Sequence, residues 1–256
     1  MSILVYPQLI QFPVQKTKRP RTVVNTAADG STVRLADPAA EITDWRLDYV
    51  DLMDDEAALL EQFFADAEGS LNGFTFLDPT ANLLAWSDAL DIDVWQTDPL
   101  LTLTDLVADP AGSTRAWHLS NPAGAGQGIG QTIEAPGGYS YCFSVYARAA
   151  TPTTLRLTAG GESADRVVTS AWDRIVFAVT PATADSVRFG IEVSSGAALD
   201  VYGPQVEAQG GASVYRATTR GGVYTDAHLG DDVFSVTRTG CNRNSCTVNI
   251  THANHF

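Results

Sequence analysis

The stretch that decides the fold is residues 139–148, Tyr-Ser-Tyr-Cys-Phe-Ser-Val-Tyr-Ala-Arg, in which apolar and polar side chains alternate. Successive side chains of a strand point to opposite faces, so this period of two predicts a β-strand with one buried face. The apolar face is expected to carry Tyr139, Tyr141, Phe143, Val145 and Ala147. The opposite face is expected to carry Ser140, Cys142, Ser144, Tyr146 and Arg148.

Similar short runs surround this strand. Residues 155–157, 172–179 and 187–193 repeat the alternation, with Gly, Pro, Ser and Asp turns between them and no helical pattern. This arrangement is typical of an antiparallel sandwich, so we predict one over residues 83–213. We interpret the glycine-rich residues 124–130 as a surface loop, because they follow Asn121-Pro122 and open no helix.

The two ends of the chain have a different pattern, which includes one helix as well as strands. Asp29-Gly30 predicts a hairpin, and residues 42–49 alternate so that Trp45, Leu47 and Tyr49 share an apolar face. A helix is expected next, capped by Asp54. Strands are expected near residues 222–224, 233–236 and 247–250, too few to bury a core alone. Residues 1–82 and 214–256 are therefore predicted to form one split, β-rich domain with a single helix, which makes the protein mainly β.

Composition excludes several classes of protein. The 256 residues are 45% apolar, and no run approaches the roughly 20 apolar residues that a membrane span needs. We therefore expect no membrane insertion, and the opening residues lack the basic start of a secretory signal. With 16 basic and 30 acidic residues, the net charge of −14 disfavours binding to nucleic acid.

One dense basic cluster stands against that acidic background, formed by Lys16, Lys18, Arg19 and Arg21. Pro13 and Pro20 suit an extended arm better than the interior of a sheet. The cluster is either a solvated arm or an assembly contact. We predict that it reaches an acidic surface on the adjoining ring of an assembly or on the neighbouring subunit.

The three cysteines cannot form a complete disulfide framework. Cys142 is expected to be an inert core residue. Cys241 and Cys246 flank what resembles a hairpin tip and are a candidate disulfide. The alternative is a metal site with His252 and His255, but their spacing fits no familiar zinc finger. We predict no metal and no cofactor.

No catalytic motif is present, so the protein is not expected to be an enzyme. The sequence has no nucleophile elbow, phosphate-binding loop or zinc-protease signature, and its many carboxylates are interpreted as solvated surface charge. Trp86, Trp95 and Trp117 are candidate carbohydrate-binding residues, because a flat exposed ring packs on the apolar face of a sugar. The alternative for each is a place in the core.

Several of these stretches carry a resemblance to a known family. Trp45-Arg-Leu-Asp-Tyr49, the helix with Phe63-Phe64, and Phe74-Thr-Phe-Leu-Asp-Pro79 resemble the hub domain of distal tail proteins from long-tailed bacteriophages and gene transfer agents. The middle of the chain, from Asn82 through Trp95 to Tyr215, is similar to the carbohydrate-binding-module-like sandwich, a jelly roll, of phage tail and fibre proteins.

The resemblance implies a structural virion protein. Distal tail proteins form a ring, usually of six subunits, that joins the tail tube to the baseplate hub and leaves a lumen through which DNA passes. The implied partners are further copies of the chain, the tail-tube protein, the baseplate hub protein and, through the sandwich, host glycan. The implied location is the tail tip of a virion made in the host cytoplasm. The alternatives are a receptor-binding minor tail protein that recognises surface carbohydrate and, less favoured, a polysaccharide depolymerase.

Overall fold

The computed structural model describes residues 4–254, which form two compact units. The residues up to Phe76 and those from Tyr224 make the first unit, and Leu77–Val223 make the second. The expected fold class is confirmed, since the described residues are mainly β-strand with one helix.

The boundaries between the units differ from the expected 82/83 and 213/214. The side chain of Asn82 donates to the Pro204 carbonyl, 3.0 Å away, and accepts from the backbone of Val206. Thr218 donates through its side chain to the Leu84 carbonyl. The segment around Asn82 is thus bonded to the segment 204–206 of the sandwich, and the segment around Thr218 is bonded to Leu84. Both segments therefore belong to the second unit.

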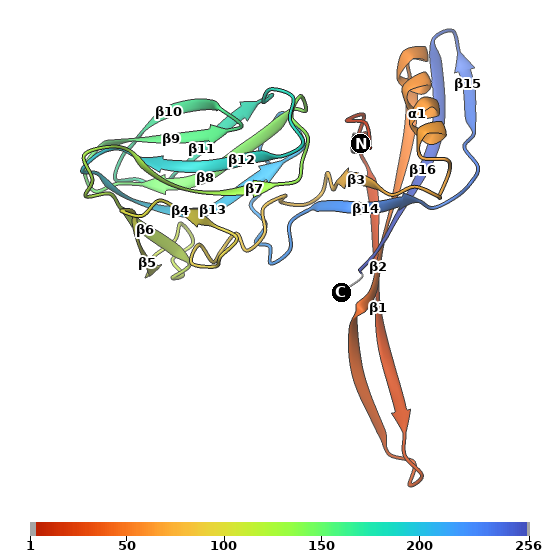
Figure 1. Ribbon diagram of the computed structural model, residues 1–256, viewed down its shortest axis with the longest axis horizontal. Coiled ribbons are helices and arrows are strands. Elements are labelled where there is room, and N and C mark those ends of the chain that lie inside the picture. Colours follow the sequence, from red (N-terminus) through yellow and green to blue (C-terminus); the bar gives the residue numbers. More distant parts are fainter. Residues whose placement is uncertain (1–3, 255–256) are drawn as a thin grey trace. The chain divides into compact units, whose positions relative to one another are not determined.

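The first unit is built on one six-stranded sheet (Figure 1). Its strands run in the order β1-β2-β16-β14-β3, and β15 pairs with β16. The elements of this unit are β1 (Val14–Thr26), β2 (Thr32–Leu52), α1 (Asp54–Asp66), β3 (Phe74–Leu77), β14 (Val223–Leu229), β15 (Val236–Gly240) and β16 (Arg243–Ala253).

The core of the first unit lies on the predicted apolar face of β2. Trp45, Leu47 and Tyr49 are each 1% exposed and cluster with Leu60 and Phe63 of α1. Asp54 is not the helix cap that we predicted. The N-cap is Met53, whose backbone N–H donates to the Glu56 side chain at 2.8 Å, because a glutamate three residues into a helix reaches back to the cap.

The Asp29-Gly30 hairpin is confirmed, and it is long. Gly30 takes the positive φ of 82° that the turn requires, and Val23 pairs with Leu35 across it. On β2, pairing with β16 begins only at Ile42. Among the described residues, 21–26 and 32–37 therefore pair only with each other, as the red and orange strands of Figure 1 show.

The second unit is an antiparallel sandwich of two five-stranded sheets, β10-β9-β12-β7-β4 and β11-β8-β13-β6-β5. Consecutive strands mostly alternate between the sheets, as in a jelly roll. The strands are β4 (Gln96–Thr97), β5 (Thr102–Val107), β6 (Ala116–Ser120), β7 (Gln127–Ile133), β8 (Tyr141–Arg148), β9 (Thr153–Ala159), β10 (Glu162–Val168), β11 (Asp173–Val179), β12 (Val187–Val193) and β13 (Ala198–Glu207).

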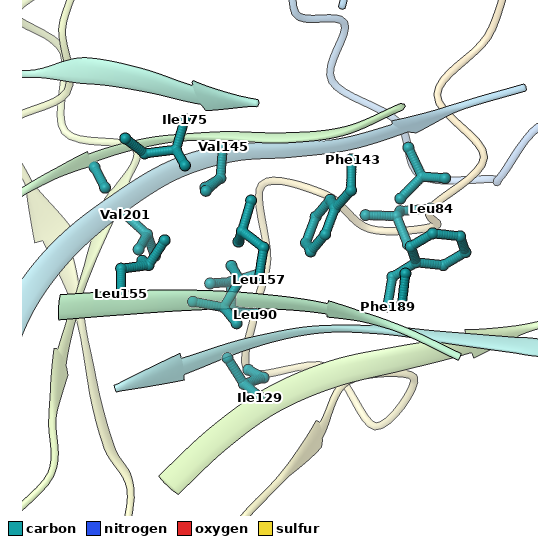
Figure 2. Close-up of a cluster of buried hydrophobic side chains, with 14 of the residues drawn as sticks. Leu84, Leu90, Ile129, Phe143, Val145, Leu155, Leu157, Ile175, Phe189 and Val201 are labelled. Atoms are coloured by element: carbon teal, nitrogen blue, oxygen red, sulfur yellow. The ribbon is translucent and has the colours of Figure 1, made fainter. Parts of the chain in front are cut away.

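The sandwich core is the apolar face predicted from residues 139–148. Figure 2 shows Phe143 and Val145 of β8 pointing toward Leu157 of β9 and Phe189 of β12 in the other sheet. The interpretation of residues 124–130 as a loop was wrong from Gln127 onward, because β7 begins there. Its glycines are needed because a Cβ on Gly130 would lie 2.5 Å from the Phe189 carbonyl oxygen and 2.9 Å from the Arg188 guanidinium.

In the part of the chain that the structure describes, no helix has the length and apolar character required to cross a bilayer.

Candidate functional site

The even-numbered side chains of β8 leave the core and form the outer face of the sheet β11-β8-β13-β6-β5. Strand pairing aligns them in rows across neighbouring strands. Arg148 of β8 is opposite Asp200 of β13, which is opposite His118 of β6. The second row lies two residues before Arg148 on β8, where Tyr146 is opposite Arg174 of β11 on one side and Tyr202 of β13 on the other.

The first row is a charged network centred on Asp200. One carboxylate oxygen accepts from Nε of Arg148 at 2.8 Å, and the other lies 2.7 Å from Nδ1 of His118. Cζ of Arg148 lies 4.8 Å from the centroid of the Trp172 ring. The ion pair and the ring together fix the guanidinium in one orientation.

The second row is aromatic. The rings of Tyr146 and Tyr202 are 6.1 Å apart at 39°, and Tyr215 meets Tyr202 edge-on at 5.2 Å. Cζ of Arg174 lies 5.3 Å from the Tyr146 centroid, and Cζ of Arg115 lies 5.1 Å from that of Tyr202. Half-buried Tyr146 is thus held between neighbours on both sides.

Tyr215 comes from outside the strands and is positioned by Gly203. This glycine has a φ of 62°, and a Cβ there would lie 2.9 Å from the Tyr215 ring. The Tyr215 hydroxyl donates to Asp88. Burial raises the pKa of Tyr215, and the hydrogen bond to the carboxylate raises it further. The phenol therefore stays protonated and anchors the segment.

That segment covers the far end of the face. The Ser213 backbone donates to Glu207 at 3.0 Å, the Arg216 backbone donates to Gln205 at 2.8 Å, and Arg174 donates to the Ser213 carbonyl. The rest of the face carries the two rows, which we call the row site: Tyr146, Arg148, Trp172, Asp200, His118 and the buried Tyr202.

The row site combines ring faces with fixed polar groups. The Arg148 and His118 side chains are 32% and 42% exposed, and Asp200 is 17% exposed. Tyrosine faces pack on apolar C–H surfaces, while arginine, histidine and carboxylate exchange hydrogen bonds with hydroxyls. This combination suits a sugar. Among the described residues, no group of three or more His, Cys, Asp or Glu side chains is placed to hold a metal.

No family model matches the sequence, and no curated protein matches it. Among solved structures, the chain is similar to the enzymatically active domain of tailspike protein 4 of bacteriophage CBA120, at 16% identity and a TM-score of 0.40, over 52% of this chain and 22% of that one. A CBM22 xylan-binding domain of Paenibacillus barcinonensis Xyn10C gives 14% identity and a TM-score of 0.42, over 55% and 98%. TmCBM61 in complex with β-1,4-galactotriose gives 11% identity and a TM-score of 0.40, over 51% and 100%.

The three tryptophans predicted to bind carbohydrate lie elsewhere. Trp95 is 5% exposed in the core, and its Nε1 donates to the Trp86 carbonyl at 3.0 Å. Trp117 packs against the core and donates to the Asp88 carbonyl. Trp86 is 41% exposed with a φ of 49°. Of the three, only Trp86 is exposed, and it is not one of the row-site residues.

The basic cluster is part of β1 and has partners in its own chain. On β2, Asp44 contacts Arg19 at 2.7 Å. Lys18 lies 3.6 Å from Glu41, and Arg21 lies 3.6 Å from Asp37. Nζ of Lys16 lies 5.5 Å from the centroid of the Trp45 ring. The segment is a paired strand and not a free arm, and Pro20 sits at its register shift.

The candidate disulfide between Cys241 and Cys246 is absent, and both residues are free thiols. Gly240 pairs with Arg243, so the turn holds only Cys241 and Asn242. Cys246 lies inside β16 opposite Val236, with its side chain buried in the core of the first unit. The turn is shorter than predicted. Cys241 is therefore exposed in the turn, whereas Cys246 is buried on the strand. His255, named for the alternative metal site, lies outside the described residues.

The sequence alone did not reveal the row site, although two of its six residues, Tyr146 and Arg148, lie in the stretch 139–148. Tyr146 and Arg148 lie on the predicted outer face, but only tryptophans were predicted to bind sugar. A strand whose outer face carries Tyr and Arg was the available signal. Asp200 and His118 could not be added, because their pairing with Arg148 depends on strand order.

Proposed function

We propose that the sandwich is a glycan-binding module whose binding surface is the row site. The observation that carries the proposal is the adjacency of an aromatic row and a charged row on one open sheet face. Tyr146 supplies a platform for a sugar ring, and Arg148, Asp200 and His118 lie one row away with fixed orientation. Positions two residues apart on a strand are about 7 Å apart, so groups of both rows can contact one sugar residue.

Binding of the purified full chain to an array of bacterial surface polysaccharides tests this proposal. The expected result is retention of at least one polysaccharide class, with no release of reducing ends during prolonged incubation, since we propose a binding protein and not an enzyme. An array on which the chain binds nothing would contradict the proposal. Release of shortened chains would favour the depolymerase.

We also propose that the first unit assembles as the distal tail ring of a phage, with the tail-tube protein and the baseplate hub protein as its neighbours and the virion tail tip as its location. The observation that favours assembly is the end of the β1–β2 hairpin. Val33 and Leu35 are 56% and 51% exposed, and they share a face with Val23. An isolated two-stranded ribbon is only marginally stable in water, so a partner is expected to cover it.

Native mass spectrometry of the full chain tests the ring. The account predicts a six-subunit species that the double variant Val33→Asp with Leu35→Asp abolishes. Val50→Asp is the matched control, because Val50 is 60% exposed on the same strand where β2 pairs with β16. A wild-type chain that stays monomeric at micromolar concentration would contradict the ring and leave the receptor-binding alternative.

A further inference from the structure

Arg148 is a fixed guanidinium with unused hydrogen-bond donors. Its Nε is bonded to Asp200, and its plane is held beside Trp172. Among the contacts of the described residues, the two terminal nitrogens of Arg148 have no protein partner. A guanidinium presents its terminal N–H groups as a fork that fits a carboxylate or phosphate in a bidentate manner.

The other arginines of this face are already engaged. Arg174 donates to the Ser213 carbonyl and the Ser144 hydroxyl, and Arg115 contacts Asp109 at 3.2 Å and Asp88 at 3.7 Å. Nε2 of His118 is a further unengaged nitrogen of the charged row among the described residues, since its Nδ1 lies against Asp200. Arg148 therefore leaves free donors on one side of this carboxylate, and Nε2 of His118 on the other side can donate or accept according to its tautomer.

The row holds one carboxylate, Asp200, for one guanidinium, Arg148, so this ion pair is neutral overall, while the whole chain carries −14. At long range the chain repels anions, so an anionic ligand must gain its affinity from short contacts at this place.

We propose that the row site recognises an anionic sugar, whose carboxylate or phosphate binds the terminal nitrogens of Arg148 while its ring packs on Tyr146. This inference rests on the proposed glycan-binding function and specifies the substrate class. Carboxylate and phosphate share the fork geometry, and the probes of the experiment separate them.

The test is isothermal titration of the full chain with two matched pairs of polymers. One pair is polygalacturonate and its carboxyl-reduced neutral form, and the other is phosphomannan and its dephosphorylated mannan. The expected result is affinity about 10- to 100-fold higher for the charged member of one pair, since a charge-assisted hydrogen bond is worth that factor. The pair that shows the preference identifies the anion. The preference should shrink between 50 mM and 500 mM salt.

Arg148→Gln should remove the preference and leave binding of the neutral polymer. Arg156→Gln is the matched control, because it makes the same change of net charge on the opposite sheet, where Arg156 is paired with Asp165 at 2.7 Å. Should the glutamine variant fail to fold, Arg148→Lys keeps the charge but loses the fork, and it should reduce the preference.

Equal affinity for charged and neutral members would overturn the inference and leave glycan binding intact. A preference that Arg148→Gln and Arg148→Lys do not change would also overturn it. Failure to bind any of the four polymers would overturn the inference, while the polysaccharide array decides the proposed function separately.

Discussion

The two outer faces of the sandwich use arginine in opposite ways. On the sheet β10-β9-β12-β7-β4, Arg156 donates through three nitrogens to Asp165 and Glu192, and no aromatic side chain points outward from these strands. On the other sheet, Arg148 gives only Nε to a carboxylate and rests beside Trp172. A surface ion pair whose donors are all bonded contributes little to stability and offers no donor to a ligand. A guanidinium that is held in place and keeps free N–H groups can bind a ligand.

Both faces depend on one core, and removing part of it gives the largest expected effect. Phe143 is fully buried between the sheets and meets Phe189 at 5.8 Å. Phe143→Ala should lower the free energy of unfolding by about 3–5 kcal/mol because it leaves a cavity. Val167→Ala, at a side chain 69% exposed on β10, should change it by less than about 0.5 kcal/mol. Urea denaturation followed by circular dichroism measures both, and equal effects would place Phe143 outside the core.

Strand β7 should not tolerate a side chain at Gly130. A Cβ on Gly130 meets backbone of the neighbouring strand at 2.5 Å, whereas one on Gly124 meets nothing within 4 Å. Gly130→Ala is therefore expected to cost about 1–3 kcal/mol of stability, and Gly124→Ala should be neutral. Thermal melts of the two variants check this difference. Identical melting temperatures would show that β7 and β12 are not in this register.

Loss of the aromatic platform should weaken glycan binding without unfolding the protein. Tyr146→Ala is expected to weaken binding of the polysaccharide retained on the array by about 10-fold or more, since it removes the ring on which the sugar packs. Thr158→Ala, on the outer face of β9, is the control and should bind normally. Titration calorimetry compares the two. Equal binding by both variants would remove Tyr146 from the site.

Thiol labelling separates covered from open surface. Burial raises the pKa of Cys142 and of Cys246 to about 11, so both remain thiols at neutral pH. Cys241 is exposed. Iodoacetamide at pH 7.5 should therefore add one label per native chain, and mass spectrometry should locate it at Cys241. Rapid labelling of Cys142 would mean that the far end of the row-site face is not covered.

The smallest expected effect is a weak pH dependence of stability from the ion pair of Arg156 and Asp165 on the sheet β10-β9-β12-β7-β4. The hydrogen bond from Arg156 holds the pKa of Asp165 below its ordinary value of 3.8. A lowered pKa in the folded state stabilises the fold above the unfolded pKa, and this contribution is lost as pH falls through the folded value. The melting temperatures of wild type and Arg156→Gln should differ slightly at pH 6 and converge below pH 3.8. A difference that persists at pH 2 would contradict this origin.

Local patterns predicted much of the fold, and pairing determined the rest. Asp29-Gly30 located a turn because few other dipeptides adopt it, and the alternation around Phe143 identified a core face. Glycines 128 and 130 misled the sequence analysis, since glycine in a strand has the signature of a loop until the neighbouring Arg188 is placed. The ion pairs between the basic cluster and β2 could not be predicted, because the two partners are about 20 residues apart in sequence and become adjacent only through the hairpin register.

The central claim is that a glycan occupies the row site, and amide chemical-shift mapping of the isotope-labelled full chain tests it most directly. Titration with the polysaccharide fragment retained on the array should shift the amides of His118, Tyr146, Arg148 and Asp200 together, with one saturation curve, and should leave β9 and β12 unchanged. Shifts confined to β9, β10 and β12, or to the first unit, would contradict the account.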